Sequence, residues 1–178
     1  MQETKLIPAI KSPEELDRIL SSNGKLVFVL FGDILTIPDI VARLKNAGKT
    51  VMVHLDLIDG LTPRDVSVDF LAENTRADGI LSTKGNLVKF AKSRGLLAIQ
   101  RFFLLDSMAL LNIEKQLPLD YVDAIEILPG IMPKIIKQLV GLTNKPIIAG
   151  GLISDQEDVL SALNAGAVAV STTKIDLV

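Results

Sequence analysis

The chain has 178 residues, a net charge of −2 at pH 7 and no cysteine, which excludes disulfides, thiol catalysis and thiolate metal sites. It is 48% hydrophobic with a mean hydropathy of +0.40, yet its apolar runs are far too short to cross a bilayer. The absence of a signal-peptide pattern predicts a cytoplasmic protein, and the length predicts one domain over residues 1–178. The absence of a basic tail and the few aromatic residues argue against strong constitutive nucleic-acid binding.

Short apolar strands alternate with amphipathic helices along the whole chain. Strands are expected at residues 6–9, 25–31, 50–56, 79–82, 96–101, 121–128, 146–149 and 167–171. Their starts follow one another at about 23 residues, which suits a compact βα unit. The pattern predicts an α/β fold, a compact TIM-like (β/α)8 barrel, with a short αβ sandwich as the alternative.

Only seven residues follow Ser171, so the eighth helix of this barrel is expected to be truncated. The last wall would then be open, covered by another element, or covered by a partner subunit. An uncovered wall would expose apolar surface, which predicts a homo-oligomer.

Helix boundaries carry local signals. Ser12, Thr62 and Ser154 are expected to cap helices, the first two followed by proline at the first helical position. Helix ends are expected just before four glycines that precede strands, namely Gly24, Gly48, Gly95 and Gly166.

Small residues follow the last two expected strands, at the barrel end where TIM-barrel sites lie. Gly150 and Gly151 follow the seventh strand, and Ser171 and Thr172 follow the eighth. Two adjacent turns of this kind let backbone N–H groups converge on an anion, and one of them opens a capped helix. These four residues are the predicted phosphate site.

Six polar residues at other strand ends form the predicted ligand pocket: His54, Asp56, Ser82, Lys84, Arg101 and Glu126. His54 and Asp56 are two residues apart, so a strand would place them on one face. Glu126 interrupts an apolar strand, and a carboxylate inside a barrel needs a cation, either Lys84 or Arg101.

Each pocket residue also has a structural interpretation. His54 would be a satisfied hydrogen-bonding group, Asp56 part of a turn, and Lys84 a solvated residue at a helix start. Glu126 and Arg101 would form a structural ion pair. Metal binding through His54, Asp56 and Glu126 is an open alternative, but no ligand spacing requires it, so neither a metal nor a cofactor is predicted.

Several blocks of sequence together resemble the glycerol-3-phosphate-responsive antiterminator family, also called glycerol uptake operon antiterminators. The blocks are His54–Leu61, Asp78–Lys84, Gln100–Ser107, Glu126–Ile131, Ala149–Ile153 and Ala169–Thr172. The resemblance implies a TIM-barrel-like fold and a cytoplasmic bacterial regulator with no catalytic residue. It further implies that glycerol 3-phosphate is the ligand and that the partner is the leader mRNA of glycerol-utilisation genes.

Two functional hypotheses follow. In the first, the protein is a transcription antiterminator whose phosphate site and pocket hold glycerol 3-phosphate. The alternative is a TIM-barrel isomerase or lyase acting on a small phosphorylated sugar or polyol. Glu126 or Asp56 would then be a general base and Lys84 an electrophile or a Schiff-base amine.

Overall fold

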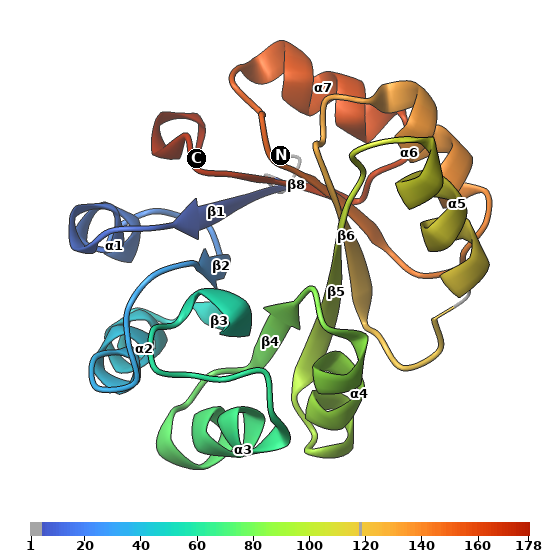
Figure 1. The fold of residues 1–178 in the computed structure, drawn as a ribbon. Helices are drawn as coiled ribbons and strands as arrows, with labels where there is room; N and C mark the ends of the chain where they lie inside the picture. Colours follow the sequence, from blue (N-terminus) through green and yellow to red (C-terminus); the bar gives the residue numbers. More distant parts are fainter. Residues whose placement is uncertain (1–4, 118) are drawn as a thin grey trace.

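A computed structural model describes residues 5–117 and 119–178 and shows a closed parallel barrel surrounded by helices (Figure 1). The eight strands pair in chain order, and β8 closes the ring against β1. The strands are β1 Leu6–Ile10, β2 Leu26–Val29, β3 Thr50–His54, β4 Gly79–Ser82, β5 Leu97–Phe103, β6 Ala124–Leu128, β7 Ile147–Gly150 and β8 Ala169–Thr172. The predicted TIM-like barrel is confirmed, and the sandwich alternative is wrong.

Among the described residues, seven α-helices and two short 3₁₀ helices connect or follow these strands. The α-helices are α1 Pro13–Leu20, α2 Ile37–Asn46, α3 Asp65–Asn74, α4 Gly85–Ser93, α5 Ser107–Gln116, α6 Pro133–Val140 and α7 Gln156–Asn164. The 3₁₀ helices are η1 Leu55–Leu57 and η2 Ile175–Leu177. No helix in the described part of the chain is long and apolar enough to span a membrane.

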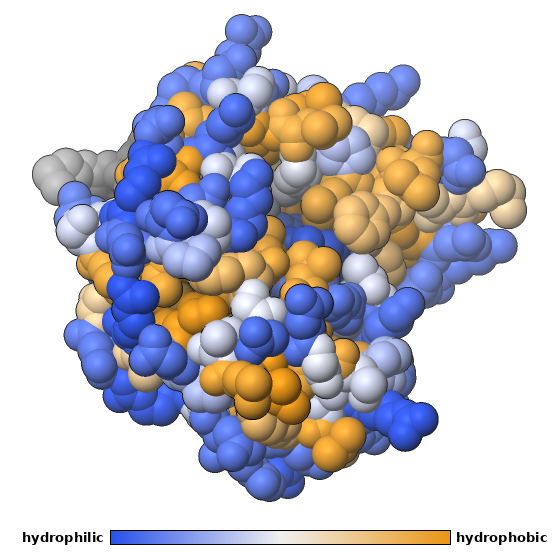
Figure 2. Space-filling model, turned by 60° about the vertical axis from the view of Figure 1, so that its left-hand side comes forward, coloured by the Kyte–Doolittle hydropathy of each residue, from blue (hydrophilic) through white to orange (hydrophobic). Residues whose placement is uncertain are grey.

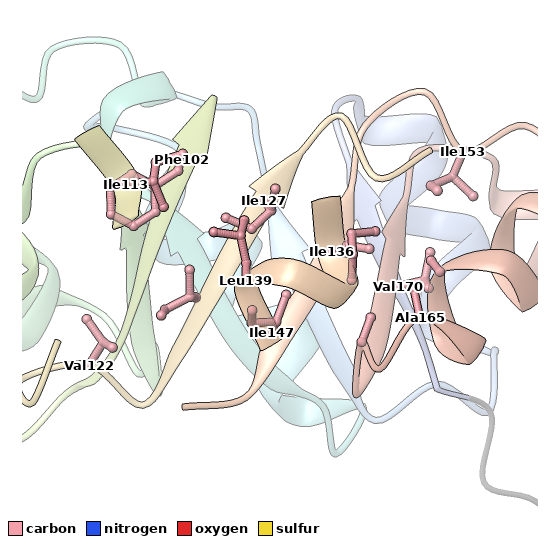
Figure 3. Close-up of a cluster of buried hydrophobic side chains, with 14 of the residues drawn as sticks. Phe102, Ile113, Val122, Ile127, Ile136, Leu139, Ile147, Ile153, Ala165 and Val170 are labelled. Carbon is pink, nitrogen blue, oxygen red and sulfur yellow. The ribbon is translucent and has the colours of Figure 1, made fainter. Parts of the chain in front are cut away.

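Alternation along the strands separates an inner core from two outer layers. Small and large apolar residues fill the inside of the barrel, among them Phe28, Met52, Leu81, Ile99 and Ile148. The intervening residues face outward and pack under the helices. Figure 3 shows part of one outer layer, in which strand residues meet helix residues: Phe102, Ile127, Ile147 and Val170 with Ile113, Ile136 and Leu139.

The wall beyond β8 is covered by the chain's own 3₁₀ helix η2. Ile175 and Val178 pack against the outer layer around α1 and α2, while Leu177 packs against the other outer layer. Asp176 also forms an ion pair with Arg18 of α1. Of the three ways to complete the wall, coverage by another element of the chain is therefore the one observed.

Self-association stays a prediction, but it loses the uncovered wall as its physical basis. Figure 2 shows hydrophobic side chains in separate groups bordered by polar ones on the face it presents. Large apolar side chains are nevertheless exposed in the loops, including Leu35 at 86%, Leu105 at 83% and Leu152 at 71%. These side chains are the remaining reason to expect contact between copies.

The predicted helix caps are partly confirmed. Ser12 caps α1, and its Oγ accepts a hydrogen bond from the Glu15 N–H at 3.3 Å. The cap predicted at Ser154 is wrong by one residue, because the Asp155 carboxylate accepts the N–H of the third helical residue. Thr62 is not a cap either: α3 begins at Asp65, and the Thr62 N–H donates to Ser67 instead.

Three of the four predicted helix ends are confirmed. Gly48, Gly95 and Gly166 follow the ends of α2, α4 and α7 with φ of 74°, 79° and 106°, a region that favours glycine. The fourth is wrong: α1 ends at Leu20, with Ser21 as its cap, several residues before Gly24.

Candidate ligand-binding site

A buried carboxylate lies at the centre of the barrel's carboxyl end. Ile125 and Ile127 belong to an outer layer, so Glu126 between them faces the barrel axis, where it is 0% exposed. Its Oε2 accepts a hydrogen bond from Arg101 Nε at 2.6 Å, and its Oε1 accepts one from the Ser171 hydroxyl at 2.6 Å. Three strands, β5, β6 and β8, are thereby joined through one charge-assisted network.

Of the two cations predicted for Glu126, Arg101 is confirmed and Lys84 is wrong. Arg101 lies on β5 opposite Glu126 in the strand register, which brings the two side chains together on the inner face. Lys84 is exposed and directly precedes α4, and its backbone N–H donates to Ser82 Oγ at 3.0 Å. The pairing therefore depends on strand register, which sequence alone did not specify.

The two glycines after β7 have different structural roles. A Cβ on Gly150 would lie 2.7 Å from Glu126 Oε1 and still closer to Ser171 Oγ, so only glycine lets β7 pass the buried network. Gly151 has φ of +77°, and its carbonyl accepts the Gly130 N–H at 3.0 Å. Leu152 follows with φ of 59°, an unusual conformation for a residue with a side chain. The turn is thus tightly constrained before any ligand is considered.

A cavity of about 90 Å³ joins this turn to the end of β8. It is lined by Ala9, Leu30, Arg101, Glu126, Leu128, Gly151, Leu152, Ile153, Ser171, Thr172 and Thr173. The N–H groups of Leu152 and Ile153 take part in no hydrogen bond among the described residues. The cavity therefore combines a buried guanidinium with backbone donors that remain available to an anion.

Thr172 lines this cavity, but its hydroxyl is already used. It donates to the Ile153 carbonyl at 3.3 Å and accepts from the Lys174 N–H at 3.0 Å. It ties the β8 turn to the β7 turn, whereas neighbouring Ser171 faces inward to Glu126. Of the four predicted phosphate-site residues, Gly151, Ser171 and Thr172 line the cavity, and Gly150 lies directly behind it.

His54 is buried at the end of β3, and its Nδ1 has no hydrogen-bond partner in the described structure. Burial, reinforced by the nearby positive charge of Arg101, lowers the pKa of His54 from 6.5 to about 4, against an opposing effect of Asp56. His54 is thus held as a neutral imidazole with one unused polar atom, the state in which it can exchange hydrogen bonds with a hydroxyl group.

The predicted common face of His54 and Asp56 is wrong. The strand ends at His54, and the 3₁₀ helix η1 carries Asp56 in a different direction. Asp56 accepts hydrogen bonds from the Ser82 hydroxyl at 2.6 Å and from the Thr83 N–H and hydroxyl at 2.7 and 2.8 Å. Although burial alone would raise the pKa of Asp56, these bonds and His54 hold it below its ordinary value.

The six predicted pocket residues therefore divide into two groups. Leu81 belongs to the inner core, so Ser82 beside it faces outward with Asp56, and Lys84 lines a separate hollow of about 170 Å³ with Asp56. Arg101 and Glu126 line the central cavity, with His54 beside Arg101. The described residues hold no group of three His, Asp or Glu side chains placed to share a metal ion.

Sequence reasoning missed the apolar residues that shape the cavity. Ala9, Leu30 and Leu128 line it from β1, from just after β2 and from β6. Strand alternation could have found Ala9 and Leu128, because each lies two residues from an inward-facing position. Leu152 and Ile153 fall inside the Ala149–Ile153 block, but their place in the cavity follows from the fold of the turn.

Comparison with known proteins connects this geometry to one family. The sequence model described as glycerol-3-phosphate responsive antiterminator matches residues 6–178. The Escherichia coli K12 protein YgcP, which is described as uncharacterized, is 42% identical over 173 residues, 97% of this chain and 91% of that protein.

Two solved structures are similar over nearly the whole chain. The glycerol uptake operon antiterminator regulatory protein of Listeria monocytogenes superposes with a TM-score of 0.90 at 34% identity, covering 98% of this chain and 94% of that one. A glycerol uptake operon antiterminator-related protein of Thermotoga maritima has a TM-score of 0.85 at 32% identity, with 98% and 97% covered.

Proposed function

Because the chain belongs to the glycerol-3-phosphate responsive antiterminator family, we propose that it binds glycerol 3-phosphate at the carboxyl end of its barrel. In that state it binds the leader mRNA of glycerol-utilisation genes in the cytoplasm and prevents premature termination. The observation that carries the ligand proposal is the cavity between the β7 and β8 turns, where Arg101 and free backbone donors meet.

The cavity offers complementary groups to the two ends of the ligand. The phosphate would lie against the turn of residues 151–153, and the Nη atoms of Arg101, whose Nε is held by Glu126, would supply further donors. The glycerol hydroxyls would contact Ser171, which lines the cavity, whereas His54 with its free Nδ1 lies outside the cavity lining, near Arg101. Since Arg101 and Glu126 neutralise each other, the backbone N–H groups carry much of the phosphate recognition.

The same geometry favours a regulator over the isomerase or lyase alternative. Both oxygens of Glu126 and both oxygens of Asp56 accept hydrogen bonds from protein groups, which favours a structural role for these carboxylates over that of a general base. Lys84 is exposed and lines the other hollow, away from the turn proposed to hold the phosphate.

The ligand proposal is tested by calorimetric titration with glycerol 3-phosphate, glycerol and inorganic phosphate. A substitution at Gly151 would confuse occlusion with backbone strain, because its φ is +77°. Leu152 offers a cleaner pair: it lines the cavity, is 71% exposed, and adopts a φ of 59° that Asn and Asp both tolerate. Leu152→Asp and Leu152→Asn differ only in charge.

We expect Leu152→Asp to weaken glycerol 3-phosphate binding by about ten-fold or more relative to Leu152→Asn, because like charges would lie close together. Equal affinities for the two variants would place the phosphate elsewhere. Conversion of the ligand during the titration would support the enzyme alternative. Leader-RNA affinity measured with and without glycerol 3-phosphate tests the antiterminator activity, and equal affinities would contradict it.

A further inference from the structure

The net charge of −2 conceals a one-sided distribution of charge. Residues 83–145 contain nine Lys and Arg against five Asp and Glu, a net charge of +4. The rest of the chain contains ten Lys and Arg against sixteen Asp and Glu, a net charge of −6. Residues 83–145 include α4, β5, α5, β6 and α6, which lie together along one side of the barrel (Figure 1). We call this segment the α4–α6 sector.

Within the α4–α6 sector, α4 and α6 contain basic residues and no acidic ones. Lys92 of α4 forms an ion pair with Asp123. Exposed lysines that form no ion pair among the described residues lie on all three helices: Lys89, Lys115, Lys134 and Lys137. These charges remain available to an external polyanion.

The helices on either side of the sector have the opposite charge. α3 carries Asp65, Asp69 and Glu73 with no basic residue, and α7 carries Glu157 and Asp158 with none. Arg94 of the sector pairs with Asp69 and Glu73 of α3. A polyanion is therefore attracted to the α4–α6 sector and repelled chiefly at its α7 border, which orients its approach.

The exposed aromatic side chain of the described structure lies in the same sector. Phe103 at the end of β5 is 49% exposed, whereas the other described Phe and Tyr rings are buried or half-buried. Phe103 is two residues from Arg101, so it lies on the inward side of β5 at the carboxyl-end rim of the sector. An exposed ring and unpaired lysines together suit single-stranded nucleic acid, because bases stack on the ring while cations bind phosphates. An acidic protein would not require the ring, and a lipid surface is separated from RNA by the test below.

We propose that the α4–α6 sector is the RNA-binding face of the protein, a proposal that rests on the proposed function. Lys134 and Lys137, three residues apart on α6, bind phosphates of the RNA. Phe103 stacks on an unpaired base of the leader.

Both elements of this face begin at the ligand cavity. Phe103 lies two residues beyond Arg101 on β5, and α6 follows the loop in which Gly130 donates its N–H to the Gly151 carbonyl. Glycerol 3-phosphate bound at the β7 turn would thus lie against the segments that position the stacking ring and the lysines. This contact gives the ligand a direct route to alter RNA affinity.

The test compares two double charge reversals of equal size. Lys134→Glu/Lys137→Glu lies inside the sector, whereas Lys5→Glu/Arg64→Glu alters exposed cations outside it. RNA binding is measured by fluorescence anisotropy with the leader transcript of the organism's glycerol-utilisation genes, at saturating glycerol 3-phosphate and several KCl concentrations. Calorimetry with glycerol 3-phosphate checks each variant's ligand site.

We expect the sector variant to lose about ten-fold or more in RNA affinity and the control to change by no more than about three-fold. Loss of two phosphate contacts should also reduce the slope of log affinity against log salt by about 1.4. Phe103→Ala should weaken binding roughly ten-fold at every salt concentration without changing the slope, while Phe103→Leu tests loss of the ring at nearly constant bulk. The affinity for glycerol 3-phosphate should be unchanged in both charge-reversal variants and in both Phe103 variants.

The outcomes separate this proposal from the proposed function. Liganded wild-type protein that does not bind leader RNA would overturn both. If the wild type binds leader RNA but the sector and control variants lose RNA affinity equally, the assignment of the RNA-binding face is wrong and the proposed antitermination activity is unaffected. Loss of ligand binding together with RNA binding in the sector variant would mean an indirect effect and would also overturn the face. Binding of the sector to phosphatidylglycerol vesicles in place of RNA would identify a membrane surface instead.

Discussion

His54 should make the stability of the fold depend on pH in a defined window. The imidazole is buried on β3, its Nδ1 has no hydrogen-bond partner in the described structure, and the charges nearest to it are Arg101 and Asp56. Burial and Arg101 lower the pKa of His54 from 6.5 to about 4, which means that the folded protein disfavours the imidazolium.

The size and sign of the effect follow from these two pKa values. At pH 7 His54 is neutral in the folded chain and mostly neutral in the unfolded chain, so it contributes little pH dependence. As the pH falls from 6.5 towards 4, the unfolded chain binds a proton that the folded chain does not, so the free energy of unfolding decreases. The full difference between the two pKa values corresponds to roughly 3 kcal/mol.

Urea unfolding of the wild type and His54→Gln at about pH 7, 5.5 and 4.5 measures this contribution. Glutamine removes the titrating group, and subtraction of the two proteins cancels the groups that do not interact with His54. Asp56, whose pKa is lowered in part by His54, titrates at more acidic pH than this window. The wild type should lose roughly 2 kcal/mol more than the variant between pH 7 and 4.5. Parallel losses in the two proteins would refute the assigned environment of His54.

Two further predictions concern the buried network. Arg101→Met should lower the free energy of unfolding by about 3–5 kcal/mol, because it leaves the Glu126 carboxylate buried without a cation. The double variant Arg101→Met/Glu126→Leu should lose less stability in urea unfolding. A double variant that loses as much as the sum of the two single variants would show that the pair is not coupled. Gly150→Ala would place a methyl group 2.7 Å from Glu126 Oε1, so we expect a loss of about 1–3 kcal/mol and weaker glycerol 3-phosphate binding. Gly150→Ala/Ser171→Gly should recover part of that stability in thermal unfolding, and no recovery would count against the steric explanation.

The barrel was predictable because its strands are buried on both faces and repeat at a regular interval. Short apolar runs such as Ile147–Ala149 are typical of strands that are buried on both faces. Gly48, Gly95 and Gly166 mark helix ends, because each adopts a positive φ. The ends of elements were less predictable, because capping depends on which oxygen reaches the free N–H groups, as Asp155 does in place of Ser154.

The site was predictable in its location but not in its internal contacts. Glu126 could be recognised as a buried carboxylate from its apolar neighbours, yet the choice of Arg101 over Lys84 required the register of β5 against β6. Strand alternation failed at Asp56, because the chain leaves the strand at His54. The two glycines after β7 look equivalent in sequence, and only the approach of Ser171 and Glu126 to one of them distinguishes their roles.

The pairing of β8 with β1 has a consequence for the order of events during protein synthesis. Arg101 and Glu126 leave the ribosome well before Ser171, so a nascent chain can form their ion pair while the ring is still open. The ligand cavity exists only after β8 has inserted between β7 and β1, since Ser171, Thr172 and Thr173 form one of its sides. A small molecule that binds this cavity therefore binds finished barrels in preference to partly made ones, and by mass action it favours closure of the ring.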